Sequence, residues 1–197
     1  FVTVIHKLLS KKKILSYHDR SDGGLITTVI EMAFAGRLGV DLNIDSLSES
    51  SKSLIDILFN EELGVVIQVR KDDKSLVMEA LASCSMAQYS YSIGTLNNDK
   101  EIKLIKDKRT LHRWSLSELL KEWHKVSYEI QTLRDNPNTA KSEYIYDVET
   151  NRKGIKPNLT FSIPRSFDFN QTKPNIAIVR EQGVNGQVEM AAAFDRV

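Results

Sequence analysis

The sequence predicts an α/β fold of the α+β layered kind, in which helices pack on a sheet and a helical connector follows. Residues 1–106 alternate between apolar residues at helical spacing and short apolar or alternating runs that are typical of strands. Residues 107–173 contain one long helical pattern and mostly polar sequence, and residues 174–197 read as a strand, a Gly/Asn loop and a helix. These segments predict a layered domain, a connector with a linker, and the opening unit of a further domain.

The first elements follow from simple patterns. Residues 2–9 are expected to form a short helix and residues 14–17 a short apolar strand. Residues 25–35 carry apolar side chains at i, i+3 and i+4 positions, which predicts a packed helix that Gly36 ends. Residues 40–44 alternate strictly between apolar and polar, as a half-buried strand does.

The next elements repeat this alternation. Residues 52–59 are expected to be helical, and residues 64–69 form an apolar run that predicts a buried strand. Residues 73–83 again show helical spacing, with Asp72 or Asp73 available as the N-cap. These elements predict helices layered against the strands.

Two further strands are expected at the end of the first segment. Residues 89–94 and 101–105 read as strands around a turn at Asn97, Asn98 and Asp99, since asparagine and aspartate favour turns. They complete the predicted sheet.

The connector is predicted to begin with a capped helix. Ser115 and Glu118 have the spacing of a capping box, in which each side chain bonds the other residue's backbone N–H. The helix is expected to run to about Leu133 and to end before Pro137, because proline disfavours a helical residue in front of it.

The remainder of the chain is less regular. Residues 138–156 are polar and weakly patterned, residues 159–163 are expected to form one strand, and residues 164–174 read as an inter-domain linker. The final strand and helix are too few to enclose a core. We therefore expect the chain to be a piece of a longer protein, with catalytic groups of its last domain beyond Val197.

Composition excludes several function classes. The formal net charge is +1, which gives no reason to expect nucleic-acid or membrane-surface binding. The single cysteine, Cys84, rules out an internal disulfide and a cysteine-based zinc site, and fits a cytoplasmic location. No apolar run approaches the roughly 20 residues that a membrane helix needs.

Residues 18–25 concentrate chemically useful side chains between an expected strand and an expected helix. Paired glycines let a backbone approach a ligand closely, and a helix start favours an anion such as phosphate. Asp19 or Asp22 is a suitable oxygen ligand for Mg²⁺, so the local chemistry is that of a Mg-nucleotide site. Aspartate and serine are also ordinary helix caps, and His18 is equally suited to a structural role. Both interpretations stay open on these residues alone.

Two segments resemble the C-terminal domain of the AIR-synthetase-like superfamily. They are residues 17–25, with residues 31–36 after them, and residues 59–69. Without that resemblance, the polar loop at residues 59–64 is more typical of a turn than of a ligand site. The resemblance implies a mixed sheet with packed helices.

A second set of segments narrows the resemblance to the long, single-chain phosphoribosylformylglycinamidine synthase family. The set comprises residues 133–137, Ala140, Glu143, residues 180–185 and residues 188–194. Enzymes of this family are ligases of purine biosynthesis that convert formylglycinamide ribonucleotide to the amidine, using ATP, Mg²⁺ and ammonia taken from glutamine.

The resemblance assigns a place to each segment. Residues 1–106 would be the second of two AIR-synthetase-like C-terminal domains, and residues 107–173 the connector. Residues 174–197 would be the truncated start of a flavodoxin-like class I glutaminase domain. The N-terminal synthetase domains and the rest of the glutaminase would lie elsewhere in the same longer protein, and the fragment alone is expected to be inactive.

The resemblance also implies roles for individual residues. In the family motif the first aspartate is associated with magnesium and the serine with nucleotide, which here are Asp19 and Ser21. This half resembles an auxiliary, structural ADP/ATP site. The glutaminase triad is a cysteine, a histidine and a glutamate, and no catalytic residue is assigned because no cysteine follows Cys84. Gly183 and Asn185 are expected to shape the first glutaminase loop.

Two other interpretations remain. One is a nucleotide-binding or regulatory domain of another AIR-synthetase-superfamily protein, against which the connector and residues 180–185 argue. The other is a structural module without a ligand, which predicts no stabilisation by nucleotide.

Overall fold

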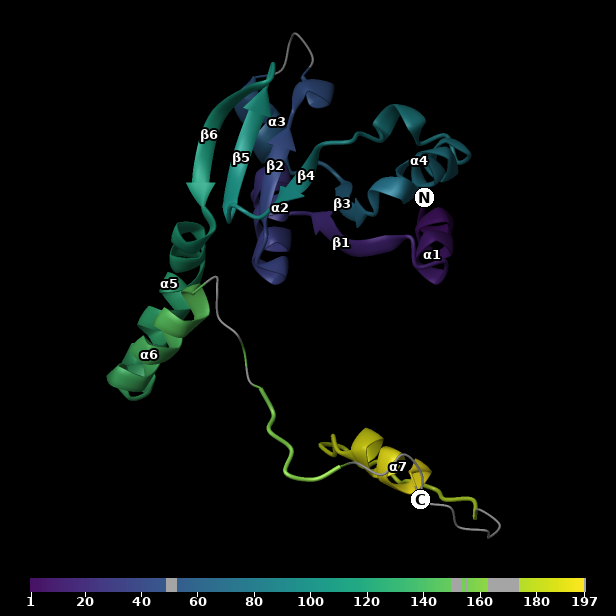
Figure 1. The fold of residues 1–197 in the computed structure, drawn as a ribbon, viewed down its shortest axis with the longest axis vertical. Helices are drawn as coiled ribbons and strands as arrows, with labels where there is room; N and C mark the ends of the chain where they lie inside the picture. The colour runs from purple at the N-terminus through teal and green to yellow at the C-terminus, as the bar shows by residue number, and fades with distance from the viewer. Residues whose placement is uncertain (49–52, 150–153, 155, 163–173, 197) are drawn as a thin grey trace. The chain divides into compact units, whose positions relative to one another are not determined.

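A computed structural model of the chain describes residues 1–48, 53–149, 154, 156–162 and 174–196. The chain divides into two compact units, Phe1–Arg152 and Lys153–Val197. Figure 1 labels the helices and strands of both units.

The first unit contains six α-helices among its described residues. They are α1 (Val2–Ser10), α2 (Gly24–Gly36), α3 (Leu54–Phe59), α4 (Lys74–Ala82), α5 (Leu116–Arg134) and α6 (Pro137–Val148). Short 3₁₀ turns lie at η1 (Asp45–Leu47), η2 (Lys71–Asp73) and η3 (Ala87–Tyr89). The predicted helices at 2–9, 25–35 and 73–83 are confirmed within a residue or two, and the helix at 52–59 is confirmed from Leu54 onward.

The strands form two sheets. They are β1 (Ile14–Arg20), β2 (Gly39–Asn43), β3 (Gly64–Val69), β4 (Gly94–Asn97), β5 (Glu101–Lys106) and β6 (Arg109–Ser115). β1 pairs with β3 in an antiparallel ribbon, while the larger sheet has the order β4-β2-β5-β6. The larger sheet is mixed, because β2 is antiparallel to β4 and parallel to β5. The predicted α/β class with a mixed sheet and packed helices is confirmed.

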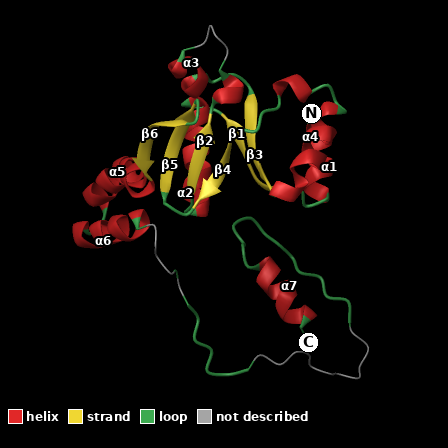
Figure 2. Ribbon diagram, turned by 45° about the horizontal axis from the view of Figure 1, so that its top comes forward, coloured by secondary structure: helices red, strands yellow, loops and turns green. Residues whose placement is uncertain are grey.

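The main core lies on one face of the larger sheet (Figure 2). Leu42 of β2 and Ile102 of β5 have no exposed surface, and Leu104 is nearly as buried. They belong to one apolar cluster with residues of α2, α3, α5 and α6. A second cluster joins α1, β1 and α4 through Ile5, Leu8, Ile14, Val77 and Leu81. The side-chain alternation expected of residues 40–44 therefore reflects a sheet with one buried face.

The predicted strand at residues 89–94 is wrong. Residues Ala87–Tyr89 form a 3₁₀ turn, and β4 begins only at Gly94. β4 and β5 do not pair with each other, since β2 lies between them. Asn97 fixes this arrangement: its amide Nδ2 donates to Asp41 Oδ1 at 2.7 Å, while its Oδ1 accepts from the Asp99 N–H at 3.0 Å.

Strand β6 is absent from the sequence-based expectations. It forms a hairpin with β5 through a turn at Asp107 and Lys108, whose φ angles are +50° and +60°. Two consecutive positive φ angles are typical of a tight hairpin turn, which usually contains glycine or asparagine. Asp107 suits the first position of such a turn, but Lys108 takes the second position, where glycine is usual, so the sequence pattern does not predict the turn.

Helix α5 starts and ends close to the expected residues, but its predicted capping box is wrong. Ser115 is the N-cap and makes no side-chain capping bond. The Leu116 N–H, which a capping box does not use, donates to the Lys100 carbonyl at 2.9 Å. A capping box does form at α3, between Ser53 and Asp56. Asp73 likewise occupies the N-cap position of α4 without capping it, and pairs with Lys13 instead.

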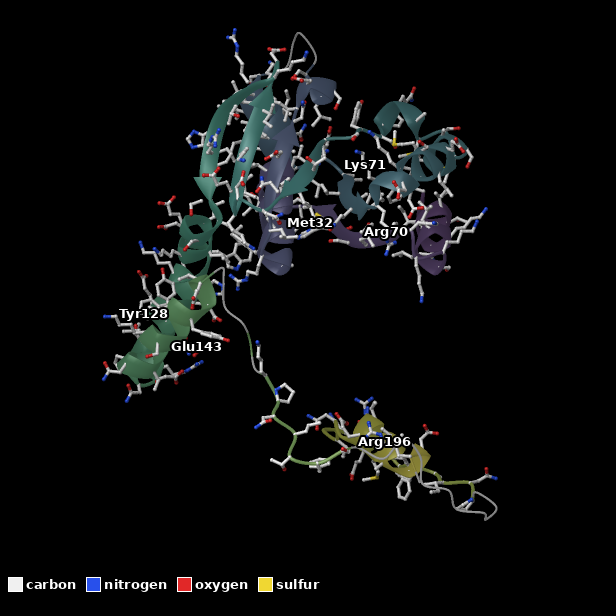
Figure 3. All side chains as sticks on the ribbon, in the orientation of Figure 1. Met32, Arg70, Lys71, Tyr128, Glu143 and Arg196 are labelled. Atoms are coloured by element: carbon white, nitrogen blue, oxygen red, sulfur yellow. The ribbon has the colours of Figure 1, made fainter. Side chains whose placement is uncertain are left out.

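The weak pattern of residues 138–156 predicts no regular element, whereas the structure has helix α6 over most of them. Asn136 caps it through its side chain, and Pro137 is its first residue. It packs along α5, where the Tyr128 and Tyr144 rings stack at 4.5 Å between centroids. Tyr128 and Glu143 mark this helix pair in Figure 3. The apolar face of α6 is narrow, with Ala140 and Val148 buried, and this explains its weak pattern.

The described residues of the second unit contain helix α7 (Gln187–Asp195), which confirms the helix predicted at the end of the chain. They contain no strand, so the strand predicted at the start of residues 174–197 is wrong, as is the one predicted at 159–163 over its described residues 159–162. A buried strand needs neighbouring strands to cover it, and none is present among the described residues of this unit. Val179 is accordingly 87% exposed. Ile163 and the expected linker up to Lys173 lie outside the described residues. The glutaminase assignment of this unit stays a prediction.

Candidate functional site

Strand β1 carries the first half of the 18–25 motif. The expected strand ends at Tyr17, whereas β1 continues through Arg20. Its pairing with β3 places Asp19 opposite Val65 and Arg20 opposite Gly64. Because side chains alternate along a strand, Tyr17 and Asp19 share the exposed face, and His18 lies on the other, half-buried face.

Tyr17 and Asp19 interact on the exposed face. The hydrogen bond between the Tyr17 hydroxyl and the Asp19 carboxylate raises the pKa of Tyr17 above its ordinary value. Partial burial and the negative charge of Asp19 act in the same direction. Asp19 thus presents its carboxylate toward solvent with a phenol beside it.

This contact predicts a pH effect. With its pKa raised in the folded state, neutral Tyr17 contributes stability below the pKa of an unfolded tyrosine, near 10. That contribution is lost as the pH rises through the folded pKa. Absorbance titration of tyrosinate should show one group that ionises late, and Asp19→Asn should move it to lower pH. Identical titration curves for the two proteins would contradict the contact.

His18 has a structural role. One ring nitrogen, Nδ1, lies 2.7 Å from the Asp19 carbonyl, and Nε2 lies 2.8 Å from Glu31 Oε2 of α2. Both partners only accept hydrogen bonds, so both bonds form together only when both ring nitrogens carry hydrogen. The imidazole therefore ties β1 to α2, in agreement with the structural alternative left open by the sequence.

A glycine turn joins β1 to α2. Ser21 and Asp22 are exposed, and Gly23 and Gly24 have φ angles of +79° and +70°. The Gly24 N–H donates to the Ser21 carbonyl at 2.9 Å. A side chain at Gly24 would meet the Phe59 backbone, since an ideal Cβ there lies 2.6 Å from the Phe59 carbonyl carbon. The paired glycines thus allow close backbone packing against α3.

The polar loop after α3 holds this turn from the outside. The Gly23 N–H donates to Glu61 Oε1 at 2.9 Å. Arg20 Nε donates to the Glu62 carbonyl at 2.8 Å, and Arg20 Nη2 lies 2.7 Å from Glu62 Oε1. Sequence reasoning treated this loop as an ordinary turn, because contacts across about 40 residues leave no local signal.

These contacts correct the expected anion site at the start of α2. The Gly23 N–H is not free, because Glu61 accepts it. Gly24, Leu25 and Ile26 are buried, so the first turn of the helix is covered. The Ser21 side chain, in contrast, is exposed.

The expected Mg²⁺ ligand, Asp19, is exposed on β1. No group of three or more His, Cys, Asp or Glu suited to a metal lies within the described residues. Mg²⁺ is commonly held by one or two carboxylates together with substrate phosphates. The exposed Asp19 therefore fits an ion that arrives with a nucleotide and does not fit a separate all-protein metal site.

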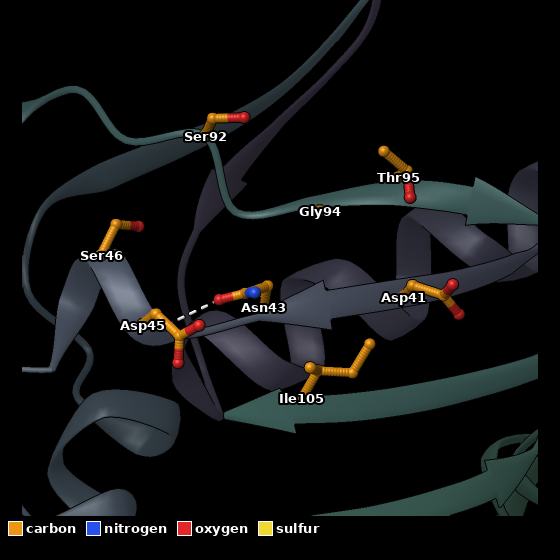
Figure 4. A pocket seen from close by; sticks show the side chains of 8 residues that line it. All are labelled: Asp41, Asn43, Asp45, Ser46, Ser92, Gly94, Thr95 and Ile105. Carbon is orange, nitrogen blue, oxygen red and sulfur yellow. Dashed lines mark hydrogen bonds between the residues drawn. The ribbon is translucent and has the colours of Figure 1, made fainter. Parts of the chain in front are cut away.

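A pocket of about 440 Å³ lies elsewhere, beside β2, β4 and η1 (Figure 4). Part of its polar lining is engaged internally: Asp41 accepts from Asn97, and Asn43 Oδ1 accepts from the Asp45 N–H at 2.8 Å. Asp45 Oδ1 in turn accepts from the Asp107 N–H at 2.7 Å. Neither Asp19 nor Ser21 lines this pocket, so it is not the site that the motif predicts.

Two further findings bear on the sequence-based expectations. Among the described residues, no helix combines the length and apolar character needed to cross a membrane. Gly183 has a φ of +87° in an exposed loop before α7, and Asn185 is exposed. Their roles stay predictions.

Comparison with known proteins identifies a family for the first segment. The profile of the family described as AIR synthase related protein, C-terminal domain, matches residues 2–107.

Three similar solved structures come from Thermotoga maritima. PurL complexed with FGAR is 14% identical, with a TM-score of 0.53, and the match covers 60% of this chain and 20% of that one. PurLQS is 13% identical, with a TM-score of 0.52 and coverages of 88% and 25%. Phosphoribosylformylglycinamidine synthase II is 12% identical, with a TM-score of 0.51 and coverages of 99% and 27%. At these identities the likeness concerns the fold, and this chain spans about a quarter of the length of those proteins.

Proposed function

The chain belongs to the AIR synthase-related C-terminal domain family, and from that premise we propose that it is part of an ATP-dependent amidoligase. The whole enzyme would be a cytoplasmic ligase of purine biosynthesis. It would convert formylglycinamide ribonucleotide, glutamine and ATP to formylglycinamidine ribonucleotide, glutamate, ADP and phosphate. Residues 1–106 would be its second AIR-synthetase-like C-terminal domain, 107–173 its connector and 174–197 the start of its glutaminase.

The site proposed for this chain is an auxiliary Mg-nucleotide half-site. The observation that carries it is the exposure of Asp19 and Ser21 on either side of Arg20, where β1 leads into the glycine turn before α2. Asp19 would hold the Mg²⁺ that accompanies the phosphates, and the Ser21 hydroxyl would bond the nucleotide. The ion would neutralise phosphate charge and so favour binding.

Fold likeness supports the same proposal. PurL of T. maritima is similar in fold and has been solved in complex with FGAR, ATP and ADP. The residue segments that resemble the single-chain synthase family add the substrate and glutamine to the proposal. The catalytic groups of both reactions would be supplied by other parts of the longer protein, and these 197 residues alone would be inactive.

The test compares variants of the full-length protein with the original protein, both for the nucleotide that they retain and for their thermal stability. Asp19→Asn and Ser21→Ala are expected to release the bound ADP or ATP and to lower the melting temperature. A ligand present at 100 times its Kd stabilises by about 2.7 kcal/mol, so a shift of several degrees is expected. Nucleotide in denatured extract and thermal unfolding measure the two effects.

Asp72→Asn is the matched control, because Asp72 is an exposed aspartate in η2. It should leave both quantities unchanged. If Asp19→Asn changes neither, the metal assignment is wrong. If the full-length protein binds nucleotide but does not convert formylglycinamide ribonucleotide with glutamine, the alternative of a nucleotide-binding or regulatory domain in another superfamily member replaces the amidoligase.

A further inference from the structure

We propose that Glu61 and Glu62 are positioning residues that hold the glycine turn in its binding conformation, an inference that rests on the proposed nucleotide site. They anchor the turn at two points. Arg20, whose side chain is only 15% exposed, binds Glu62 through both a backbone and a carboxylate oxygen. Gly23 is held by Glu61 Oε1. Ser21 and Asp22 are the two residues between these anchors.

The loop is itself fixed, which it must be to act as an anchor. The Glu62 N–H donates to Asn60 Oδ1 at 2.9 Å, so the loop is closed by its own asparagine. Directly after the loop, Gly64 pairs with Arg20 in the β1–β3 ladder. An added Cβ at Gly64 would lie 3.2 Å from Arg20 Nε, so the absence of a side chain there lets Arg20 lie close along β3. The loop that carries Glu61 and Glu62 is therefore held in place by the pairing of β1 with β3.

The anchors matter because the turn contains two adjacent glycines. Fixing the backbone of a residue costs conformational entropy, and glycine loses more freedom than other residues. If the free protein already holds the turn, the nucleotide does not have to supply this ordering free energy. Loss of one anchor should therefore weaken binding about tenfold.

Glu61 has a second, opposing effect. Its carboxylate lies at the turn that an anionic nucleotide approaches, and charge repulsion alone would weaken binding. For Glu61→Ala, the positioning role predicts weaker nucleotide binding, whereas relief of charge repulsion predicts tighter binding. Glu61→Gln keeps an oxygen that can accept from the Gly23 N–H while removing the charge. This pair of substitutions separates the two effects.

The experiment measures the Kd of Mg-ADP by calorimetry for the full-length protein after removal of bound nucleotide. Glu61→Ala is expected to raise the Kd about tenfold, and Glu61→Gln should restore it to within about threefold of the original protein. Glu62→Ala should also raise the Kd. Glu79→Ala, at an exposed glutamate of α4, is the matched control and should not change it.

Two outcomes would overturn the inference. If Glu61→Ala and Glu61→Gln both bind Mg-ADP as tightly as the original protein or more tightly, Glu61 is not positioning the turn. If both weaken binding equally, the carboxylate acts in some way other than by accepting from Gly23. Asp19→Asn and Ser21→Ala, measured in the same titrations, keep the proposals distinguishable. Unchanged binding in these two variants refutes the nucleotide site, whereas loss there without an effect of Glu61→Ala refutes only the positioning role.

Discussion

Replacing Gly24 with alanine is expected to destabilise the domain by about 3 kcal/mol. Two independent costs add at this position. The φ of +70° lies in the left-handed region, where an L side chain costs roughly 1–2 kcal/mol. The new Cβ would also lie 2.6 Å from the Phe59 carbonyl carbon and 2.8 Å from the Leu58 carbonyl oxygen. These are backbone atoms, so α2 and α3 would have to move apart.

Chemical denaturation of the two proteins measures this loss as a lower midpoint with an unchanged slope. Gly36→Ala is the matched control at the other end of α2, because nothing lies within 4 Å of its added Cβ. It should be neutral or should stabilise by up to about 1 kcal/mol. Equal effects at the two glycines would show that α2 does not approach α3 as closely as described.

Leu42→Ala should be among the most damaging truncations in the larger sheet. Leu42 has no exposed surface and lies on β2, between β4 and β5. Leucine-to-alanine changes at such sites cost about 3–5 kcal/mol, because the transfer free energy and a residual cavity add together. The free energy of unfolding, obtained from denaturant titration, should fall by that amount.

Leu96→Ala makes the same chemical change on β4, at the edge of the sheet, where the residue is 47% exposed. A loss below about 1 kcal/mol is expected, because much of this side chain is already in water. Leu96 pairs with Val40, so it points to the same face of the sheet as Leu42. Similar losses for the two variants would therefore mean that this face is as buried at the edge strand β4 as it is at the central strand β2.

The candidate site was predictable where its chemistry is local. Asp19, Ser21 and the two glycines are consecutive or nearly so, and their residue types alone indicate a turn before a helix that is suited either to a Mg-nucleotide or to ordinary capping. The tie from His18 to Glu31, and the contacts of Arg20 with the loop after α3, were not predictable. Those partners lie 13 to 42 residues away and are brought close only by the pairing of β1 with β3 and the packing of α2.

The sequence-based predictions of the fold that are wrong fail for the same reason, which is that contacts between distant residues override local preferences. The turn at Asp107 and Lys108 adopts positive φ angles without glycine or asparagine, because the pairing of β5 with β6 holds it there. Ser115 has the sequence of a capping residue, but it is also the last residue of β6, where it pairs with Glu101 of β5. In both cases a long-range backbone contact replaces the local preference.

The sequence by itself determined the α/β class, most helices of the first unit and the residues of the candidate motif, because these depend on periodicity and on side-chain types within a few positions. The tertiary structure decided which strands pair, that β2 separates β4 from β5, and that Glu61 rather than solvent meets the Gly23 N–H. Strand order and loop anchoring depend on contacts between distant residues, whose free energy appears only when the whole core is assembled.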